Sequence, residues 1–262
     1  MNCHYVSRSL TRSWETGRRK LTFYDFTTKT IDVESPKKLF ARPNLNSSED
    51  ERWLGANVEG PLGRFLKLRR KTRAWSPDIR DMAIYRALLL LVPVQIARIA
   101  KAAGGNAAFD EIFQWPEARL DAFVASLRSV YSVVIVQGHR DCPLFVTEQG
   151  FFPVPIPEAS PTTAAANAVP ISATEAAMIL PRSMDRNVVR RTLTQGEGFY
   201  LNNCSLGTNA NRVVIHPAIL DAMNPIALMA EIESTRRRNV DCYRTSLRRL
   251  GTSSSARFDE RA

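Results

Sequence analysis

The sequence predicts an α+β fold in which N- and C-terminal strands form a sheet around a central helical layer. Three observations predict it. Residues 1 to about 45 alternate polar and apolar side chains with the period of strands. Residues 47–129 carry capping signals and apolar residues at helical spacing. β-branched runs return from Tyr131 onward. We expect a single α+β domain over residues 1–240 and a partly disordered tail over residues 241–262.

The N-terminal strands are predicted from alternation with period two. Leu21–Asp25 is one such segment, and Thr30–Glu34 is a second one after a turn at Thr28–Lys29. Ser35–Pro36 is expected to end the second strand. An ordered pattern this close to the first residue also predicts that no leader peptide precedes the domain.

Capping residues and proline punctuate the helical middle. Ser47 or Ser48, followed by acidic residues, supplies a helix cap and a first turn suited to the positive end of the helix dipole. Gly60–Pro61 is predicted to interrupt this segment, because proline lacks the N–H donor and clashes one turn back. A further helix is expected from Pro116.

The longest predicted helix starts at Ser76–Pro77–Asp78, where a capping serine precedes a proline and an acid. It should run to about Ala103, with a kink at Pro93. Its apolar run, Ala87–Ala97, is shorter than the ~20 residues that a membrane-spanning helix needs. We therefore interpret it as a core helix and expect no membrane partner.

The C-terminal half is predicted to alternate between strands and helices. β-branched and apolar runs predict strands at Ser132–Val136, Leu144–Thr147, Val169–Ser172, Ala177–Leu180 and Arg212–His216. A helix or a helical turn is predicted at Asn202–Ala210, and an amphipathic helix is predicted at Pro225–Arg238.

Composition bounds the class of protein. The content of 44% hydrophobic and 24% charged residues is that of a soluble globular protein. The cysteines are scattered, without zinc-site spacing, which favours reduced thiols in a cytoplasmic protein and predicts no metal site. Glycine-rich phosphate loops, a nucleophile elbow and His-Glu-x-x-His are absent from the sequence. No motif indicates a cofactor, whose identity stays unknown.

The charge balance has two interpretations. A net charge of +10 and a pI near 9.8 favour a nucleic-acid partner or another polyanion. Arginine, however, greatly outnumbers lysine, as coding bias in a GC-rich genome would produce. The basic runs Arg69–Lys71 and Arg236–Arg238 stand at predicted helix ends, where such charges also complement the helix dipole.

Several short blocks together resemble a family of uncharacterised bacterial proteins. They are His4–Val6, Phe23–Asp25, Ser35–Phe40, Glu59, Gln95–Arg98, Pro143–Val154, Val169–Ser172, Leu201–Asn202 and Asn209–Ala210. In their order and spacing, over residues 2 to about 220, they resemble domain of unknown function family 4238, which typically begins with His-Tyr-Val-Pro. Ser7 replaces the proline of that element. Glu148 falls in a turn where the family carries an aspartate, which implies an altered or inactive site if the aspartate is functional.

Five residues are candidates for a site. His4, Glu59 and Glu148 are candidate catalytic groups, because histidine and carboxylates move protons near neutral pH. Gln95 and Arg98 share a helical face and are candidate anion-binding groups. A buried arginine also needs a partner such as Glu59 or Glu148, so a structural ion pair is the alternative. We expect His4 to be buried where the first strand meets the C-terminal sheet, as a proton shuttle or as a structural anchor.

Two functions from different classes remain open. The first is a nucleic-acid-associated protein, such as a nuclease in a defence setting, which the charge and His4 with its candidate carboxylates favour. The second is a non-catalytic interaction or scaffold module, which the lack of any catalytic motif favours. Convergence of His4, Glu59, Arg98 and Glu148 in one cleft would favour the first function, and their separation would favour the second.

Overall fold

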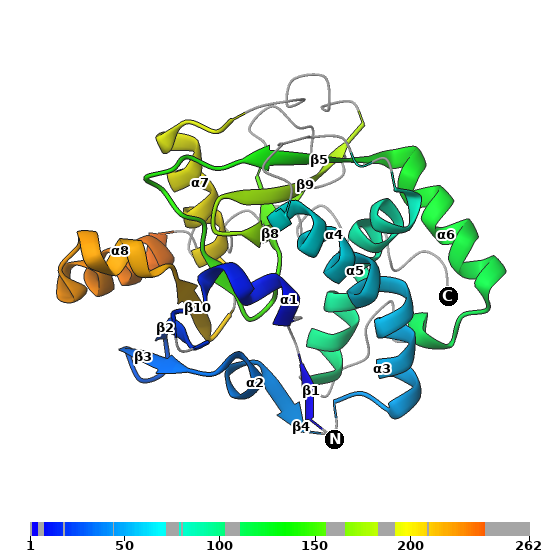
Figure 1. Ribbon diagram of the computed structural model, residues 1–262, viewed down its shortest axis with the longest axis horizontal. Helices are drawn as coiled ribbons and strands as arrows, with labels where there is room; N and C mark the ends of the chain where they lie inside the picture. Colours follow the sequence, from blue (N-terminus) through cyan, green and yellow to red (C-terminus); the bar gives the residue numbers. More distant parts are fainter. Residues whose placement is uncertain are drawn as a thin grey trace, which may run out of the picture.

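The computed structural model describes residues 2–4, 8–17, 19–43, 45–71, 79, 81–102, 111–155, 166–182, 192–208 and 210–238. Its helices and two four-stranded antiparallel sheets form an α+β fold, as predicted (Figure 1). The predicted tail, residues 241–262, lies outside the described residues.

The first sheet joins N- and C-terminal strands in the order β3-β2-β10-β6, and all its pairs are antiparallel. Its strands are β2 (Leu21–Asp25), β3 (Thr30–Glu34), β6 (Val146–Thr147) and β10 (Arg212–Ile215). The register places Arg212 opposite Asp25 and Ile215 opposite Thr22. This sheet confirms the predicted joining of strands from the two ends of the chain.

The second sheet has the order β5-β9-β8-β7 and is also antiparallel. Its strands are β5 (Tyr131–Gln137), β7 (Phe152–Val154), β8 (Ala166–Ser172) and β9 (Glu175–Pro181). Strands β5 and β9, which pair with each other along seven residues, are buried along most of their length, which explains their runs of apolar residues.

The first strand has a different partner from the one predicted. β1 (Asn2–His4) pairs with β4 (Ala41–Pro43), and His4 lies opposite Ala41 in this two-stranded sheet. The expectation that β1 meets the C-terminal sheet is therefore wrong for its backbone pairing. The short turn of α2 (Pro36–Leu39) leads directly into β4, which brings β4 within reach of the N-terminus.

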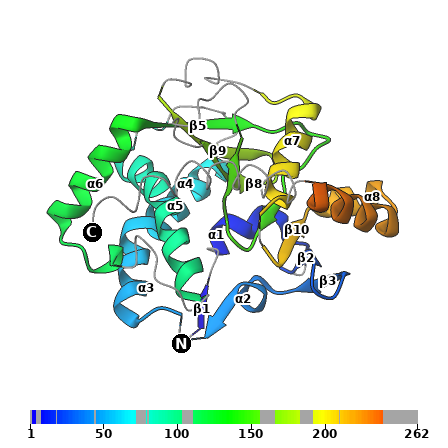
Figure 2. The same ribbon diagram turned by 180° about the vertical axis from the view of Figure 1, so that it is seen from behind.

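Helices fill the space between and beside the sheets. Those not yet given are α1 (Arg8–Thr11), η1 (Arg12–Trp14), α3 (Ser48–Leu54), η2 (Gly55–Glu59), α4 (Gly60–Lys71), α5 (Met82–Ala102), η3 (Ile112–Gln114), α6 (Glu117–Val130), α7 (Gln195–Leu206) and α8 (Pro217–Ala222). A further helix covers residues 225–238. From the front and from behind, α7 and α8 lie on the side of the molecule opposite α3 and α6 (Figures 1 and 2).

The predicted break at Gly60–Pro61 is replaced by a π-helix. The cap at Ser47 is present, since its side chain accepts a hydrogen bond from Asp50 N. The chain then continues as helix from α3 through η2 into α4. Gly60 N–H donates to Gly55 O, a five-residue step. This wider turn changes the local hydrogen bonding one residue before Pro61, so the chain stays helical instead of stopping.

α5 forms the centre of the core. Its predicted start at Ser76–Asp78 lies outside the described residues, and the described helix begins at Met82, where Asp81 Oδ1 accepts from Ala83 N at 2.8 Å. Among the described helices, only α5 is long and apolar enough to cross a membrane, and 61% of its most apolar 18-residue stretch is buried inside the protein. Leu88 and Leu90 are fully buried, as expected of a core helix.

Candidate ligand-binding cleft and the predicted site residues

A cleft of about 880 Å³ opens between α7, α8 and the helix of residues 225–238. Most of its lining is apolar: Pro143, Phe145, Phe199, Leu206, Ala218, Ile219, Ala222, Met223, Ala227, Leu228 and Ile232. The polar lining residues are Arg140, Asp141, Cys142, Asn202, Asn203, Glu231 and Thr235. Pockets of roughly 300–1,000 Å³ with a few polar groups are typical of small-molecule sites.

Each helical wall of the cleft begins with its own capping signal. α7 opens with a capping box, in which Thr194 N donates to Glu197 Oε2 at 2.8 Å and Glu197 N donates to Thr194 Oγ1 at 3.3 Å. At the start of α8, Ala218 N donates to His216 Nδ1 at 3.2 Å. The helix of residues 225–238 begins where Ile226 N donates to Asn224 Oδ1 at 2.8 Å. Local sequence therefore fixes where all three walls start.

Asn202 holds the floor of the cleft together. Its Oδ1 accepts from Phe145 N at 2.8 Å, and its Nδ2 donates to Pro143 O at 2.9 Å. The buried amide thus ties the backbone of the 143–145 segment to α7. Gly198, one turn earlier, allows close packing there, because a Cβ at this position would lie 3.0 Å from Cys142 Sγ.

The mouth of the cleft exposes large apolar side chains. Phe199 is 53% exposed and Met223 is 40% exposed. Phe199 and Met223 also line the cleft. Apolar side chains gathered at an opening lose contact with water when a ligand covers them, which favours binding.

The polar groups of the cleft are suited to binding more than to covalent chemistry. Burial raises the pKa of the Cys142 thiol above its ordinary value, so it stays protonated near neutral pH and is a weak nucleophile. Glu231 accepts from Thr235 Oγ1 at 3.1 Å and forms an ion pair with Arg238 at 3.5 Å. Together with Asp141, it places carboxylate acceptors in a mainly apolar lining.

Three of the predicted site residues meet elsewhere in the fold. Glu59, Gln95 and Arg98 line a small cavity that α1, η2 and α5 enclose. Gln95 is 4% exposed and Arg98 is 1% exposed. The space left between them is about 10 Å³, close to the volume that one water molecule needs and too small for a phosphate group.

Burial dominates the electrostatics of this cavity. It raises the pKa of Glu59 above its ordinary value, while the positive charge of Arg98 lowers that pKa and the negative charge of Glu51 raises it further. The net shift is upward, so the attraction of Arg98 only partly offsets the cost of removing the carboxylate from water.

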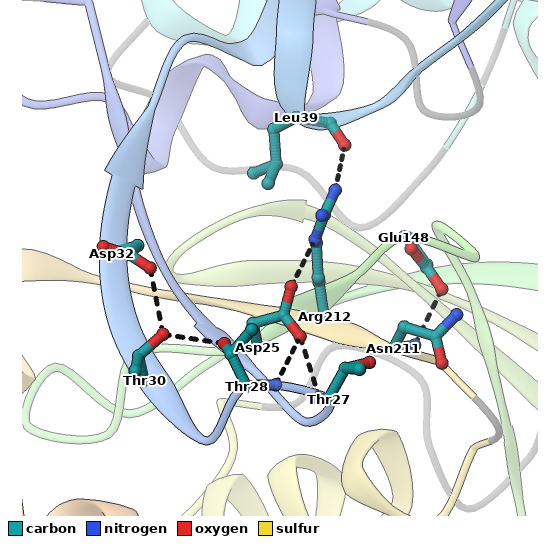
Figure 3. Close-up of polar contacts among 9 residues, drawn as sticks. All are labelled: Asp25, Thr27, Thr28, Thr30, Asp32, Leu39, Glu148, Asn211 and Arg212. Atoms are coloured by element: carbon teal, nitrogen blue, oxygen red, sulfur yellow. Dashed lines mark hydrogen bonds and ion pairs between the residues drawn. The ribbon is translucent and has the colours of Figure 1, made fainter.

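Glu148 lies at the first sheet instead. It directly follows β6, and its Oε1 accepts a hydrogen bond from Asn211 N at 2.7 Å (Figure 3). It is not among the residues that line the cavity with Glu59 and Arg98. The backbone of His4 lies in β1, and its side chain falls outside the described part of the structure. The five predicted residues thus include one converging group of three.

Sequence reasoning missed the cleft. Its walls were predicted only in part, since the amphipathic helix at residues 225–238 was expected while α7 was placed several residues too late, at Asn202–Ala210. The capping box of Thr194 and Glu197 is the signal that would have located the start of α7.

Within the described ranges, no group of three or more His, Cys, Asp or Glu side chains could hold a metal ion.

Comparison with known proteins yields no relative. No family model, no curated protein and no solved structure matches the chain. The resemblance to domain of unknown function family 4238 therefore stays a prediction.

Proposed function

We propose that the protein is a binding module that holds a largely apolar small molecule in the cleft between α7, α8 and the helix of residues 225–238. The observation that carries this proposal is the cleft itself, with its volume of about 880 Å³ and its mainly apolar lining. The proposal takes up the interaction-module alternative. Catalysis by His4, Glu59 and Glu148 is not part of it, because Glu59 and Glu148 lie in different parts of the fold.

The lining suggests the character of the ligand. Phe199 and Met223 expose apolar surface for a hydrophobic body, and the almost fully buried Phe145, Leu228 and Ile232 lie behind it in the lining. Each Å² of apolar ligand surface removed from water contributes about 25 cal/mol. Glu231 offers a carboxylate that accepts hydrogen bonds, which favours a ligand with one neutral or cationic donor group over an anionic ligand.

Titration with Nile red, a neutral apolar fluorophore of small-molecule size, tests the proposal. We expect saturable binding with a blue-shifted emission. Ala227→Trp places a large side chain on the cleft wall and should weaken binding at least tenfold. Ala230→Trp is the matched control, because Ala230 is exposed on the same helix and does not line the cleft.

Thermal melting of both variants shows whether they fold like the wild type. Absence of saturable binding to the wild type would overturn the proposal. Equal loss of binding in the two folded tryptophan variants would also overturn it, because the fluorophore would then sit outside the cleft.

A further inference from the structure

The exposed face of α4 is mainly basic. The helix contains five basic residues and no acidic one: Arg64, Lys67, Arg69, Arg70 and Lys71. Arg64, Lys67 and Arg70 are exposed and follow one another at intervals of three residues, about 4.5 Å along the helix axis. The opposite face, with Leu62 and Phe65, is buried in the core. The charges of Arg64, Lys67 and Arg70 are therefore directed to solvent.

A second element adds to this charge. Arg12 of η1 is exposed and close enough to α4 for its charge to act on Arg70. Partial burial, followed by the charge of Arg12, lowers the pKa of Arg70, and Glu15 opposes this effect. Glu175, another nearby acid, is engaged by Arg69, whose Nε donates to its Oε2 at 3.1 Å. Arg12 thus adds a fourth exposed cation to Arg64, Lys67 and Arg70 of α4.

We propose that this basic face, made of Arg12, Arg64, Lys67 and Arg70, binds the phosphate backbone of a nucleic-acid duplex without reading the base sequence. Arginine guanidinium groups match phosphate geometry through paired N–H donors, and a row of cations releases the counterions that the backbone condenses. The inference is independent of the proposed ligand cleft, because α4 lies apart from α8 in both views (Figures 1 and 2).

Two other anionic partners fit this surface less well. A helix that binds a membrane surface inserts its apolar face between the lipids, whereas the apolar face of α4 is buried within the protein, with Leu66 only 3% exposed. A single-stranded nucleic acid is held by stacking of its bases on aromatic side chains. The exposed positions of α4 carry Arg64, Lys67, Leu68 and Arg70, none of which is aromatic.

The C-terminal basic run is a weaker candidate. The guanidinium group of Arg236 lies over the Phe26 ring, 3.7 Å from its centroid, and therefore helps to attach the helix to the first sheet. Arg238 forms an ion pair with Glu231. Charges that already have such contacts lose them when they turn to a phosphate, which reduces the net gain from binding.

Fluorescence anisotropy with a short labelled duplex of mixed sequence tests the proposal. The variant Arg64→Gln/Lys67→Gln/Arg70→Gln removes three charges from the face, and Lys20→Gln/Lys37→Gln/Lys38→Gln removes three exposed charges elsewhere. We expect wild-type binding at ~50 mM salt and a slope of log affinity against log salt that is shallower by about 3 in the first variant. The control should keep a slope within about one unit of wild type.

Two additional measurements separate the alternatives. Arg64→Lys/Arg70→Lys keeps the charges and should retain most of the affinity. If it does, weak binding by the triple variant results from lost charge and not from a damaged α4. Vesicles containing phosphatidylserine and a single-stranded oligonucleotide should bind at least tenfold more weakly than the duplex. The proposal is overturned if the duplex does not bind at ~50 mM salt, if both triple variants behave alike, or if vesicles or single strands bind more tightly.

Discussion

Arg212 and Asp25 form an ion pair that joins the first residue of β10 to the last residue of β2. Arg212 Nε donates to Asp25 Oδ2 at 2.8 Å, and its Nη1 donates to Leu39 O at 3.2 Å (Figure 3). The other carboxylate oxygen of Asp25 accepts from Thr27 N at 2.8 Å and from Thr28 N at 3.3 Å. The pair therefore connects the C-terminal strand to the N-terminal hairpin and to α2.

We predict that Asp25→Asn lowers the free energy of unfolding by about 2 kcal/mol at neutral pH, because charge-assisted hydrogen bonds contribute more than neutral ones. Burial alone would raise the pKa of Asp25, but the hydrogen bonds from Arg212, Thr27 and Thr28 outweigh it and hold the pKa below its ordinary value. The contribution is thus present above the unfolded pKa and lost as pH falls through the folded pKa. Urea unfolding at neutral and acidic pH measures this, and a difference from wild type that persists at low pH would contradict it.

Arg98 gives a second prediction. We expect Arg98→Met to lower the free energy of unfolding by ~3 kcal/mol at neutral pH, because Glu59 would then be a buried carboxylate without its cation. Glu59→Gln in the same chain should recover much of the loss, since it removes the charge that Arg98 compensates. A melt of the single variant within a degree of wild type would contradict the prediction.

The pH dependence of the Arg98→Met variant follows from the same cavity. The pKa of Glu59 is raised in the folded state, so its stabilising contribution is present at low pH and is lost as pH rises through the folded pKa. The charge of Arg98 lowers this pKa, so without Arg98 the pKa should rise further and the protein should lose more stability as pH rises. We expect the gap between the melting temperatures of wild type and variant to widen as pH rises from acidic to neutral. A gap that stays constant would show that Glu59 is not the group involved.

The π-helix makes Gly55 and Gly60 differ in how well they tolerate a larger side chain. A Cβ at Gly60 would lie 2.5 Å from Gly55 O, a contact with rigid backbone, while a Cβ at Gly55 would meet nothing within 4 Å. We predict that Gly60→Ala destabilises the protein by about 1–3 kcal/mol. Gly55→Ala should stabilise it by about 0.5–1 kcal/mol, because alanine loses less backbone entropy in a helix. Urea unfolding of the two variants compares them directly, and equal effects would show that the five-residue step does not require Gly60.

Sequence reasoning succeeded where local pattern decides structure. The period-two alternation of Leu21–Asp25 and Thr30–Glu34 became β2 and β3, and Ser47 caps α3 with the acidic first turn that follows it. The face shared by Gln95 and Arg98 followed from helical spacing, and the structure places Glu59 beside it. These features depend on side chains a few residues apart, together with the general requirement that a buried charge has a counter-charge.

Sequence reasoning failed where one local pattern is compatible with two structures and where structure depends on distant segments. The sequence pattern around Gly60 does not distinguish a π-helix from a helix break, because a glycine followed by a proline within a helical pattern is compatible with both. The 880 Å³ cleft needs α7, α8 and the helix of residues 225–238 to stand apart. That spacing depends on distant contacts, because α7 packs against β7 of the second sheet whereas the helix of residues 225–238 packs against the first sheet. Glu148 was grouped with Arg98 on the expectation that a buried arginine needs an acid, but it accepts a hydrogen bond from Asn211 N instead.

The final prediction concerns the attachment of the helix of residues 225–238. Tyr24, which is 1% exposed in β2, donates from its hydroxyl to Glu233 Oε1 at 2.7 Å. Beside it, Arg236 packs over Phe26. These contacts hold the helix against the first sheet and thereby fix one wall of the cleft, since Leu228 and Ile232 line it.

We predict that Tyr24→Phe speeds amide hydrogen exchange in residues 225–238 by roughly tenfold, because the lost hydrogen bond to a carboxylate contributes about 1.5 kcal/mol. Nile red affinity should fall with it, since a detached helix no longer closes the cleft. Tyr200→Phe is the matched control: it removes a hydroxyl that donates to Pro155 O, also at 2.7 Å, but from α7. Exchange in residues 225–238 should be unchanged in that variant. If both substitutions speed exchange there equally, the helix is held by the fold as a whole and not by the Tyr24–Glu233 contact.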